Sequence, residues 1–439
     1  MYQISKAGTL HIHPMIHFKW ILFFLFSFTA VFTTGQAPYN VYHGNLHSHT
    51  SYSDGVGTPR QAFNYARDSA KIDFLAVTDH LEYIYNDIYE WDSTKIMADE
   101  ATVNGVFFGI AGYEWTSFTY NHCSVFNTPN LIPATNQNDW NAFLLSVIDE
   151  LPAFGQFNHP GLYGNQWNQF TNMGILADSA FSMIEIRDTL QESYYRQALD
   201  SNWHVSPCNN QDNHQANWGT LSEACTGIWS TQLSRNGLFD AIIAGRIFAS
   251  QDKNAGIWID INGYAMGSSI PYSINLPLHI YINDPDSEIW SSIQVTGTTN
   301  QQFLNLYNHD SFLDTIIYIN PYATKWIYVR ALQYDYQYII SAPLYFSGTA
   351  TGINEEPAHI EVLPNPLCEM SGIVFTLMKA ENVEIDLFDS KGQFLISLCN
   401  QKLSGGNHTF HIPSEVMNQG IYFLRYSDDQ NIKTLKLIR

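Results

Sequence analysis

Nine histidine, aspartate and glutamate residues in the first half of the chain recur at the spacing of a multinuclear metal centre. They are His47, His49, Asp54, His80, Glu114, His122, His159, Asp212 and His214. The densest stretch contains His47 and His49, and then Asp54, Asp79 and His80. On a β-strand, residues two apart project from the same face, so the imidazoles of His47 and His49 converge on one point. One metal ion can bind both.

The residue types in this set predict its chemistry. Six imidazoles and three carboxylates aimed into one cleft carry a heavy cost of desolvation and repulsion unless cations organise them. Two adjacent divalent ions lower the pKa of a shared water until hydroxide forms near neutral pH, and they neutralise the charge that develops on the attacked oxygen. Hydrolysis is therefore the expected reaction.

Short apolar runs that read as strands precede most of these residues. The runs cover residues 74–77, 107–110, 154–157, 183–186 and 203–205. Between the first two strands, Thr58 and Pro59 read as the N-cap and first residue of a helix, and three alanines continue at helical spacing. Alternating strands and helices can close into an α/β barrel, with the reactive groups at the carboxyl ends of the strands.

Six motifs in this order resemble the polymerase-and-histidinol-phosphatase (PHP) domain. They comprise residues 46–55, 78–80, 112–114, 158–160 and 211–214, together with His122. Within that family, the chain looks most similar to a secreted branch that includes a carbamate-insecticide hydrolase. The resemblance covers about residues 40–255. The resemblance is specific because the motifs occur in the family's order and at spacings compatible with the family's pattern.

The resemblance implies an α/β fold, a distorted (β/α)7 TIM-like barrel, holding two or three divalent metals. The ligands would form three groups, with Glu114 as a bridge between the first two: His47, His49 and Asp212; His122 and His159; and Asp54, His80 and His214. In some relatives a histidine stands where this chain has Asp54. The carboxylate oxygen of Asp54 is a harder ligand than an imidazole nitrogen, and it therefore favours manganese or iron as the metal without excluding zinc.

Three residues near the cluster have more than one interpretation. Asp54 is a ligand in the scheme above, but it could instead cap its own loop. Asp79 is expected to orient a histidine or the metal-bound water rather than to bind a metal. Arg187 would pair either with an anionic group of the substrate or internally with Glu185 or Asp188. Asp79, Arg187 and the bridging glutamate are the candidate catalytic residues.

Composition restricts the class of partner. The chain has 439 residues, enough for two or three domains, and 15% of them are aromatic, which suits well-filled β-rich cores. It has 41 acidic and 20 basic residues and a formal net charge of −21. Such a surface repels polyanions, so no nucleic-acid partner is expected, although some relatives of the fold accompany polymerases. A small-molecule substrate is expected instead.

Residues 1–35 read as an export signal. Lys19 precedes an apolar run over residues 20–32, and residues 33–35 supply the small side chains of a cleavage site. The run is short for a membrane span, so no transmembrane span is expected in the mature protein. The five cysteines show no CxxC spacing, and an oxidising compartment would allow the pairs Cys208–Cys225 and Cys368–Cys399.

The rest of the chain reads as two small β-sandwich domains joined by a linker at residues 348–359. Residues 256–347 contain alternating apolar runs and no catalytic constellation, so a structural role is expected, with Trp290 or Tyr334 as a possible ligand contact. Residues 360–439 resemble the C-terminal sorting domain of type IX secretion. The resemblance implies that the export machinery is a partner and that the protein crosses the periplasm to be released or held at the cell surface.

Three functions remain open from the sequence. The first is a phosphoesterase that uses a metal-bridging hydroxide, and the second is a hydrolase of carbamate, ester or amide bonds. The third is a non-catalytic surface protein whose metal centre is structural or binds a ligand. The complete ligand set disfavours the third. Few cations accompany the site beyond Arg187 and Arg246, so the sequence does not choose between the first two.

Overall fold

The computed structural model describes most of the chain from residue 39 onward. The described residues are 39–85, 87–132, 137–298, 301–321, 324–347, 360–363, 367, 372–377, 380–404, 406–413, 417–428 and 432–439. The expected signal peptide, the expected linker at 348–359 and Cys368 lie outside them. Among the described residues, no helix is both long and apolar enough to cross a membrane.

A mixed sheet occupies the first half of the described chain, in the order β9-β8-β1-β2-β3-β4-β5-β6-β7. Its strands are β1 (Asn40–Asn45), β2 (Phe74–Val77), β3 (Phe108–Trp115), β4 (Cys123–Phe126), β5 (Phe154–Phe157), β6 (Phe181–Glu185), β7 (Ser206–Cys208), β8 (Cys225–Ser230) and β9 (Ile247–Ser250). Strands β1 to β3 are parallel to one another, as are β5 to β7. Strands β4 and β8 run antiparallel to both of their neighbours.

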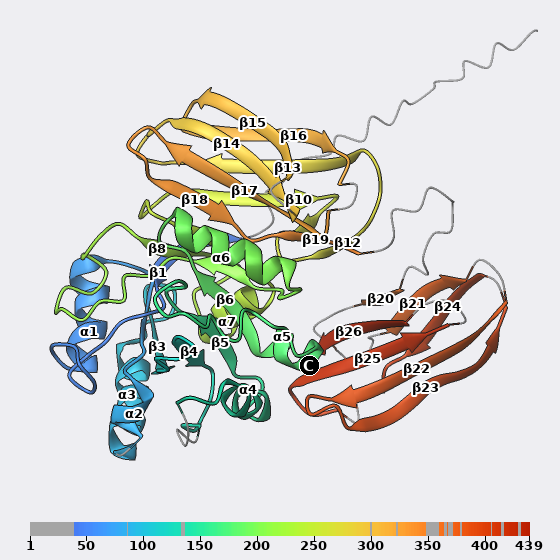
Figure 1. Ribbon diagram of the computed structural model, residues 1–439, viewed down its shortest axis with the longest axis horizontal. Helices are drawn as coiled ribbons and strands as arrows, with labels where there is room; N and C mark the ends of the chain where they lie inside the picture. Colours follow the sequence, from blue (N-terminus) through green and yellow to red (C-terminus); the bar gives the residue numbers. More distant parts are fainter. Residues whose placement is uncertain are drawn as a thin grey trace, which may run out of the picture. The chain divides into compact units, whose positions relative to one another are not determined.

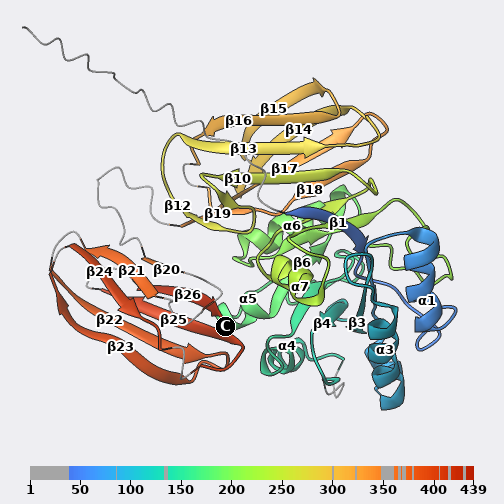
Figure 2. The ribbon, with the colours of Figure 1, turned by 180° about the vertical axis from the view of Figure 1, so that it is seen from behind.

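Helices surround these strands, as Figures 1 and 2 show from opposite sides. They are α1 (Pro59–Tyr65), the π-helical turn η1 (Ala66–Ala70), α2 (Leu81–Ile84), α3 (Ile88–Ala101), α4 (Trp140–Asp149), α5 (Ile175–Ala180), α6 (Thr189–Asp200) and α7 (Arg235–Ile243). Thr58 caps α1 as predicted, in a reciprocal capping box with Gln61, and Pro59 is the first helical residue. Asp188 caps α6 through the backbone N–H of Gln191.

The sheet departs from simple strand–helix alternation where β3 leads directly into β4 and where β7 leads directly into β8. Strand β4 follows β3 without an intervening helix and runs back along it. The eight-residue β3 forms an antiparallel ladder with β4, whose four residues are all buried. The strand expected at residues 203–205 begins instead at Ser206. After β7, the backbone N–H of Asn209 donates to the hydroxyl of Thr226 in β8, and its side-chain amide donates to the carbonyl of Ser250 in β9. These bonds connect β7, at one end of the strand order, with β8 and β9 at the other end.

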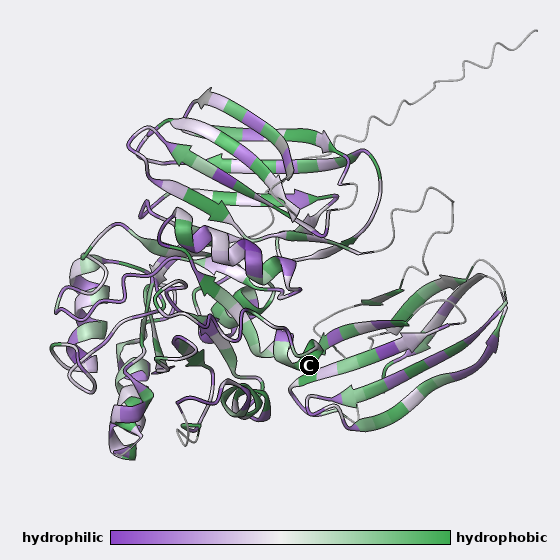
Figure 3. Cartoon of the chain, in the orientation of Figure 1, coloured by the Kyte–Doolittle hydropathy of each residue, from purple (hydrophilic) through white to green (hydrophobic). Residues whose placement is uncertain are grey.

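The middle part of the chain forms two sheets. Its strands are β10 (Gly256–Ile261), β11 (Tyr264–Ala265), β12 (Ser269–Pro271), β13 (Leu276–Asn283), β14 (Trp290–Gly297), β15 (Gln301–His309), β16 (Phe312–Ile319), β17 (Trp326–Gln333), β18 (Tyr338–Ser341) and β19 (Leu344–Ser347). Strand β13 alternates buried and half-buried residues, as predicted, and Figure 3 shows the alternation as bands of hydropathy. Strand β18 pairs with β9, so one of these sheets continues into the sheet of the first half.

The C-terminal part of the chain has its own apolar core, which includes Ile373, Ile385 and Leu424. Its strands are β20 (Ile360–Leu363), β21 (Gly372–Leu377), β22 (Glu381–Asp389), β23 (Phe394–Leu403), β24 (Gly406–His411), β25 (Ile421–Ser427) and β26 (Ile432–Ile438). They form one sheet in the order β20-β21-β24 and another in the order β23-β22-β25-β26.

Cys208 and Cys225 are separate buried thiols, so the pair that the sequence allowed between them is not formed. The reason is local, because the two thiols have different neighbours. The sulfur of Cys208 lies 3.3 Å from the side-chain oxygen of Gln156, and that of Cys225 lies 3.3 Å from the carbonyl of Asp252.

Candidate metal centre

Glu114 is the point on which most of the predicted ligands converge. It lies near the end of β3, and its side chain is 1% exposed. Five imidazole nitrogens lie within 3.3 Å of its two carboxylate oxygens: those of His47, His49, His80, His122 and His159. The imidazoles come from the four segments that follow β1, β2, β3 and β5, so the sheet brings distant parts of the chain to one carboxylate.

Asp212 approaches the same cluster from the loop after β7. Its Oδ1 lies 3.3 Å from Nε2 of His47, 3.2 Å from Nε2 of His49 and 3.7 Å from Nδ1 of His214. Asp212 and His159 both have left-handed backbones, with φ of 48° and 33°. Such conformations are costly for residues other than glycine and concentrate at functional sites.

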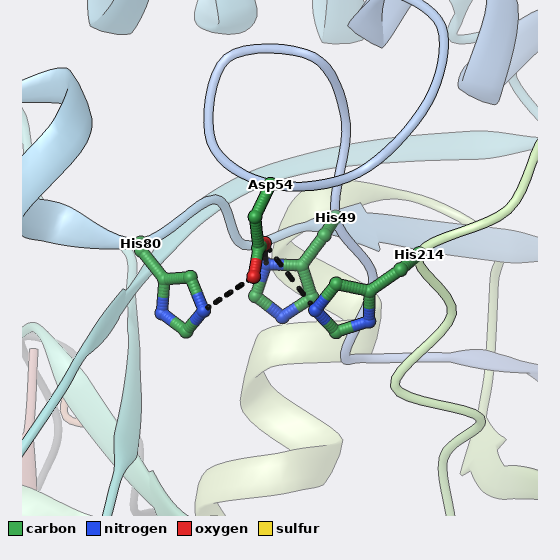
Figure 4. Close-up of side chains that lie close together, drawn as sticks. All are labelled: His49, Asp54, His80 and His214. Carbon is green, nitrogen blue, oxygen red and sulfur yellow. Dashed lines mark ion pairs between the residues drawn. The ribbon is translucent and has the colours of Figure 1, made fainter. Parts of the chain in front are cut away.

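Asp54 lies among three imidazoles at the edge of the cluster (Figure 4). Its carboxylate oxygens lie 3.3 Å from His214, 3.6 Å from His80 and 3.7 Å from His49. The side chain is 45% exposed, whereas those of the histidines are more buried. The carboxylate therefore faces imidazoles, which favours the ligand interpretation over that of a loop cap.

All nine predicted ligands fall into donor groups whose atoms lie within 4.8 Å of one another. The groups are His49, Asp54, His80 and His214; His47, His159 and Asp212; His47, His49 and Glu114; and His80, Glu114 and His122. The grouping differs from the sequence scheme in that His49 joins the group of Asp54, and His122 and His159 lie in separate groups. Glu114 belongs to two groups, as a bridging carboxylate would.

The donor set fits divalent cations. Imidazole nitrogens and carboxylate oxygens are the ligands that zinc, manganese and iron take in proteins. Nε2 of His122 and Nδ1 of His159 are buried without a hydrogen-bond partner among the described residues. Unpaired buried nitrogens are costly, and a bound cation would satisfy those that face the cluster.

Burial and mutual pairing shift the pKa values within the cluster in opposite directions. Burial disfavours the charged form of His47, but nearby carboxylates raise its pKa well above the usual value. Burial likewise opposes ionisation of Glu114, yet the surrounding imidazoles hold its pKa well below its usual range. Burial lowers the pKa of His80 to about 4. The carboxylate at the centre is therefore ionised, and His80 is neutral at neutral pH, whereas a cation bound by His47 would have to displace a proton from it.

Three further side chains contact the candidate ligands, and sequence reasoning did not assign these contacts. Glu185 accepts from Nδ1 of His47 at 2.9 Å and from the backbone N–H of His159 at 2.7 Å. Asn158 donates to Glu114 at 2.7 Å, and Thr116 lies 2.7 Å from Nδ1 of His80. The position of Glu185 at the end of a predicted strand and that of Asn158 within a motif could have indicated a role at the site. Nothing in the sequence indicates one for Thr116.

Asp79 and Arg187 both lie next to the cluster. Asp79 accepts hydrogen bonds from the backbone and hydroxyl of Thr50 and from the hydroxyl of Ser53, so it holds the loop that carries Asp54. Arg187 donates to Glu185 at 2.9 Å and lies 3.4 Å from Asp212. Of the two internal partners considered for Arg187, the structure selects Glu185, because Asp188 caps α6.

Aromatic side chains border the cluster on one side. The ring of Tyr163 packs 5.4 Å from that of His122 and 5.5 Å from that of Phe118. Tyr83 lies 6.2 Å from the ring of His80. Phe118 is 71% exposed and Tyr83 is 53% exposed, which leaves apolar surface beside the histidines.

Residues 361–439 match the family model of the secretion system C-terminal sorting domain. The match confirms the sorting domain expected from the sequence. It assigns the type IX secretion machinery as a partner of this part of the chain and indicates secretion or a cell-surface location. No curated protein is similar enough to the chain to count as a relative.

Two solved structures are similar to parts of the molecule. One, from Bacteroides vulgatus, is described as a two-domain protein containing a predicted PHP-like metal-dependent phosphoesterase. Its sequence is 15% identical to this chain, with a TM-score of 0.40, and the match covers 84% of this chain and 96% of the Bacteroides vulgatus chain. The other is dimeric latent PorU from Porphyromonas gingivalis, at 13% identity and a TM-score of 0.17, over 41% of this chain and 20% of that one.

Proposed function

We propose that residues 40–255 form a secreted metal-dependent phosphoesterase of the PHP type, built on a distorted (β/α)7 barrel. The observation that supports this proposal is the convergence of five imidazoles within 3.3 Å of the buried carboxylate of Glu114. Divalent cations bound there would acidify a coordinated water and neutralise charge on the attacked group. Glu185 would orient His47, and Arg187 would face an anionic substrate from beside Asp212.

The proposal is tested with the full mature chain after loading with zinc, manganese or iron in separate preparations. The substrates are p-nitrophenyl phosphate, bis(p-nitrophenyl) phosphate, p-nitrophenyl acetate and an aryl carbamate. Turnover of a phosphoester that chelation removes and metal restores supports the proposal. Failure on every substrate, with metal bound, would instead favour the non-catalytic surface protein.

A carbamate, ester or amide hydrolase is the second candidate, favoured because Arg187 is the only lysine or arginine among the described residues that pairs with a carboxylate of the cluster. Arg187 is already paired with Glu185 and Asp212, which reduces its capacity to bind a phosphate. The exposed ring of Phe118 offers a surface for a neutral aromatic group instead.

The variant Arg187→Gln separates the two candidates. A phosphoesterase should lose about tenfold to a hundredfold in kcat/KM for phosphoesters, the range of one charge-assisted hydrogen bond, with little change for neutral esters. Equal losses on both substrate classes would show that Arg187 acts only through its internal partners.

A further inference from the structure

A second group of acidic side chains lies outside the histidine cluster, where β9 leads into the middle part of the chain. Asp252 follows β9, and Asp284 and Glu288 lie between β13 and β14. Carboxylate oxygens of the three residues lie within 4.8 Å of one another. Asp252 is 4% exposed and Asp284 is 2% exposed, so two of the three charges are withdrawn from water.

The negative charge of this group has no cationic partner among the described residues. Gln333, at the end of β17, places Nε2 at 2.9 Å from Asp252, 2.8 Å from Asp284 and 3.3 Å from Glu288. Backbone N–H groups of Asn254 and Ala255 also donate to Asp252, and that of Asp286 donates to Asp284. All of these donors are uncharged, so they leave the three negative charges uncompensated. Lys253, next to Asp252 in the chain, pairs with Glu223. Buried carboxylates without a counter-charge are costly.

The side chain of Gln333 supplies an independent sign of a missing ligand. Its residue is 1% exposed, and its Oε1 is buried without a hydrogen-bond partner. Turning the amide by half a rotation would exchange Oε1 with Nε2 and direct the oxygen at the three carboxylates. Oxygens that share a calcium ion lie about 3 Å apart, given calcium–oxygen distances of 2.3–2.6 Å. The separations of 2.8–3.3 Å around Gln333 match that arrangement.

We propose that Asp252, Asp284, Glu288 and Gln333 bind a calcium ion. The set consists of hard oxygen donors, in contrast to the imidazoles of the metal centre. Magnesium is less suited, because it keeps several waters and is seldom held by protein ligands alone. The ion would link the segment after β9 to the β13–β14 loop and to the end of β17, and so would stabilise the junction between the two halves of the continuous sheet.

The pKa values of the group agree with an uncompensated charge. Burial raises the pKa of Asp284, and the neighbouring Asp252 raises it further. Burial and the nearby carboxylates of Asp252 and Asp335 raise the pKa of Glu288 as well. A bound cation would remove this repulsion.

The test uses the full mature chain with its histidine centre already loaded with zinc. Of the candidate metal groups among the described residues, the acidic group is then the one left free for calcium. Calorimetric titration with calcium chloride should show one calcium per chain. In millimolar calcium, Tm should rise by about 5 °C, as expected for a ligand at roughly a hundred times its Kd. The double variant Asp284→Asn, Glu288→Gln should lose both effects, and Asp310→Asn, at an exposed acid in the same part of the chain, should keep them.

In calcium-free buffer the double variant should be at least as stable as the unmodified protein, because it removes repelling charges. A loss of calcium binding therefore cannot be attributed to unfolding. The proposal is overturned if calcium leaves Tm unchanged in the unmodified protein. It is equally overturned if the double variant retains the bound calcium, which would then lie elsewhere.

Discussion

Glu114 connects the largest number of groups in the site. Each of its carboxylate oxygens faces more than one imidazole, and Asn158 donates to it at 2.7 Å, so its position is held from several directions. A buried carboxylate surrounded in this way can bridge two cations and keep them at a constant separation. Its charge, rather than its size, is the property that the site requires.

The variant Glu114→Gln tests this role, because the amide keeps the size of the side chain and removes its charge. We expect kcat to fall at least about a hundredfold, the scale of losing one dominant electrostatic contribution. Steady-state kinetics together with elemental analysis measure the effect, since the metal content should also fall. The fold should be retained by circular dichroism.

Glu100→Gln is the matched control, since the same chemical change occurs at an exposed residue of α3 that pairs with Arg60. Exposed ion pairs contribute little, so this variant should be nearly silent. If both variants turned over substrate equally well, Glu114 would not bridge metals.

Phe118 is the residue that should influence which leaving groups are accepted. Its exposed ring stands against Tyr163, which in turn packs on His122. Phe118→Ala should raise KM for aryl substrates by up to about tenfold, the range of one aromatic contact, and leave kcat nearly unchanged. Comparing a p-nitrophenyl ester with a methyl ester of the same acid measures this difference, and equal changes for both would exclude a contact with the leaving group.

At the scale of elements, the loop between β1 and α1 decides whether Asp54 reaches the imidazoles. The loop turns back on itself, with the N–H of Gly55 bonded to the carbonyl of Thr50. Asp79, from the end of a neighbouring strand, accepts from Thr50 and Ser53 and so fixes the loop against the sheet. The position of Asp54 thus depends on a contact with another element.

Asp79→Asn should loosen this loop, because the amide presents one acceptor oxygen in place of two. We expect the metal bound near Asp54 to be weakened by about tenfold to a hundredfold, the usual effect of losing a partner that orients a ligand, while the groups around Glu114 keep theirs. Metal stoichiometry after dialysis against a weak chelator measures the change. Asp92→Asn, at an exposed position of α3, is the control, and the same metal loss in both variants would contradict the assignment.

At the scale of the whole molecule, the candidate metal ligands and the sorting domain lie in different parts of the chain. The sheet that carries the metal centre continues through the β9–β18 ladder into the middle part. The C-terminal part has separate sheets and a separate core, and residues 361–439 match the sorting-domain family. Sorting and catalysis should therefore be separable by truncation.

Deleting residues 360–439 should leave hydrolytic activity intact but keep the protein in the periplasm. The expectation follows because none of the candidate metal ligands lies in the deleted part. Cell fractionation with an activity assay and immunodetection measures the distribution. Normal delivery of the truncated chain to the surface would contradict the sorting role.

The sequence alone was enough to predict the strands at residues 74–77 and 154–157 and the cap of α1, and to select the candidate ligands that the fold brings together. These features are local. Each of these patterns depends on residues that lie within a few positions of one another. Examples are an HxH pair, an alternation of period two and a threonine before a proline. The sorting domain could also be predicted from the sequence, because its motifs lie within one continuous stretch of the chain.

Tertiary structure alone decided how the candidate ligands are grouped and which side chains contact them. The placement of His49 with Asp54, the bond from Glu185 to His47 and the antiparallel β4 all depend on the register between strands. The cluster around Gln333 is the clearest case, because Asp252 lies 81 residues away from it in the chain. Contacts of that range leave no periodic signal in the sequence, since they arise only when the packing of the core sets which loops meet.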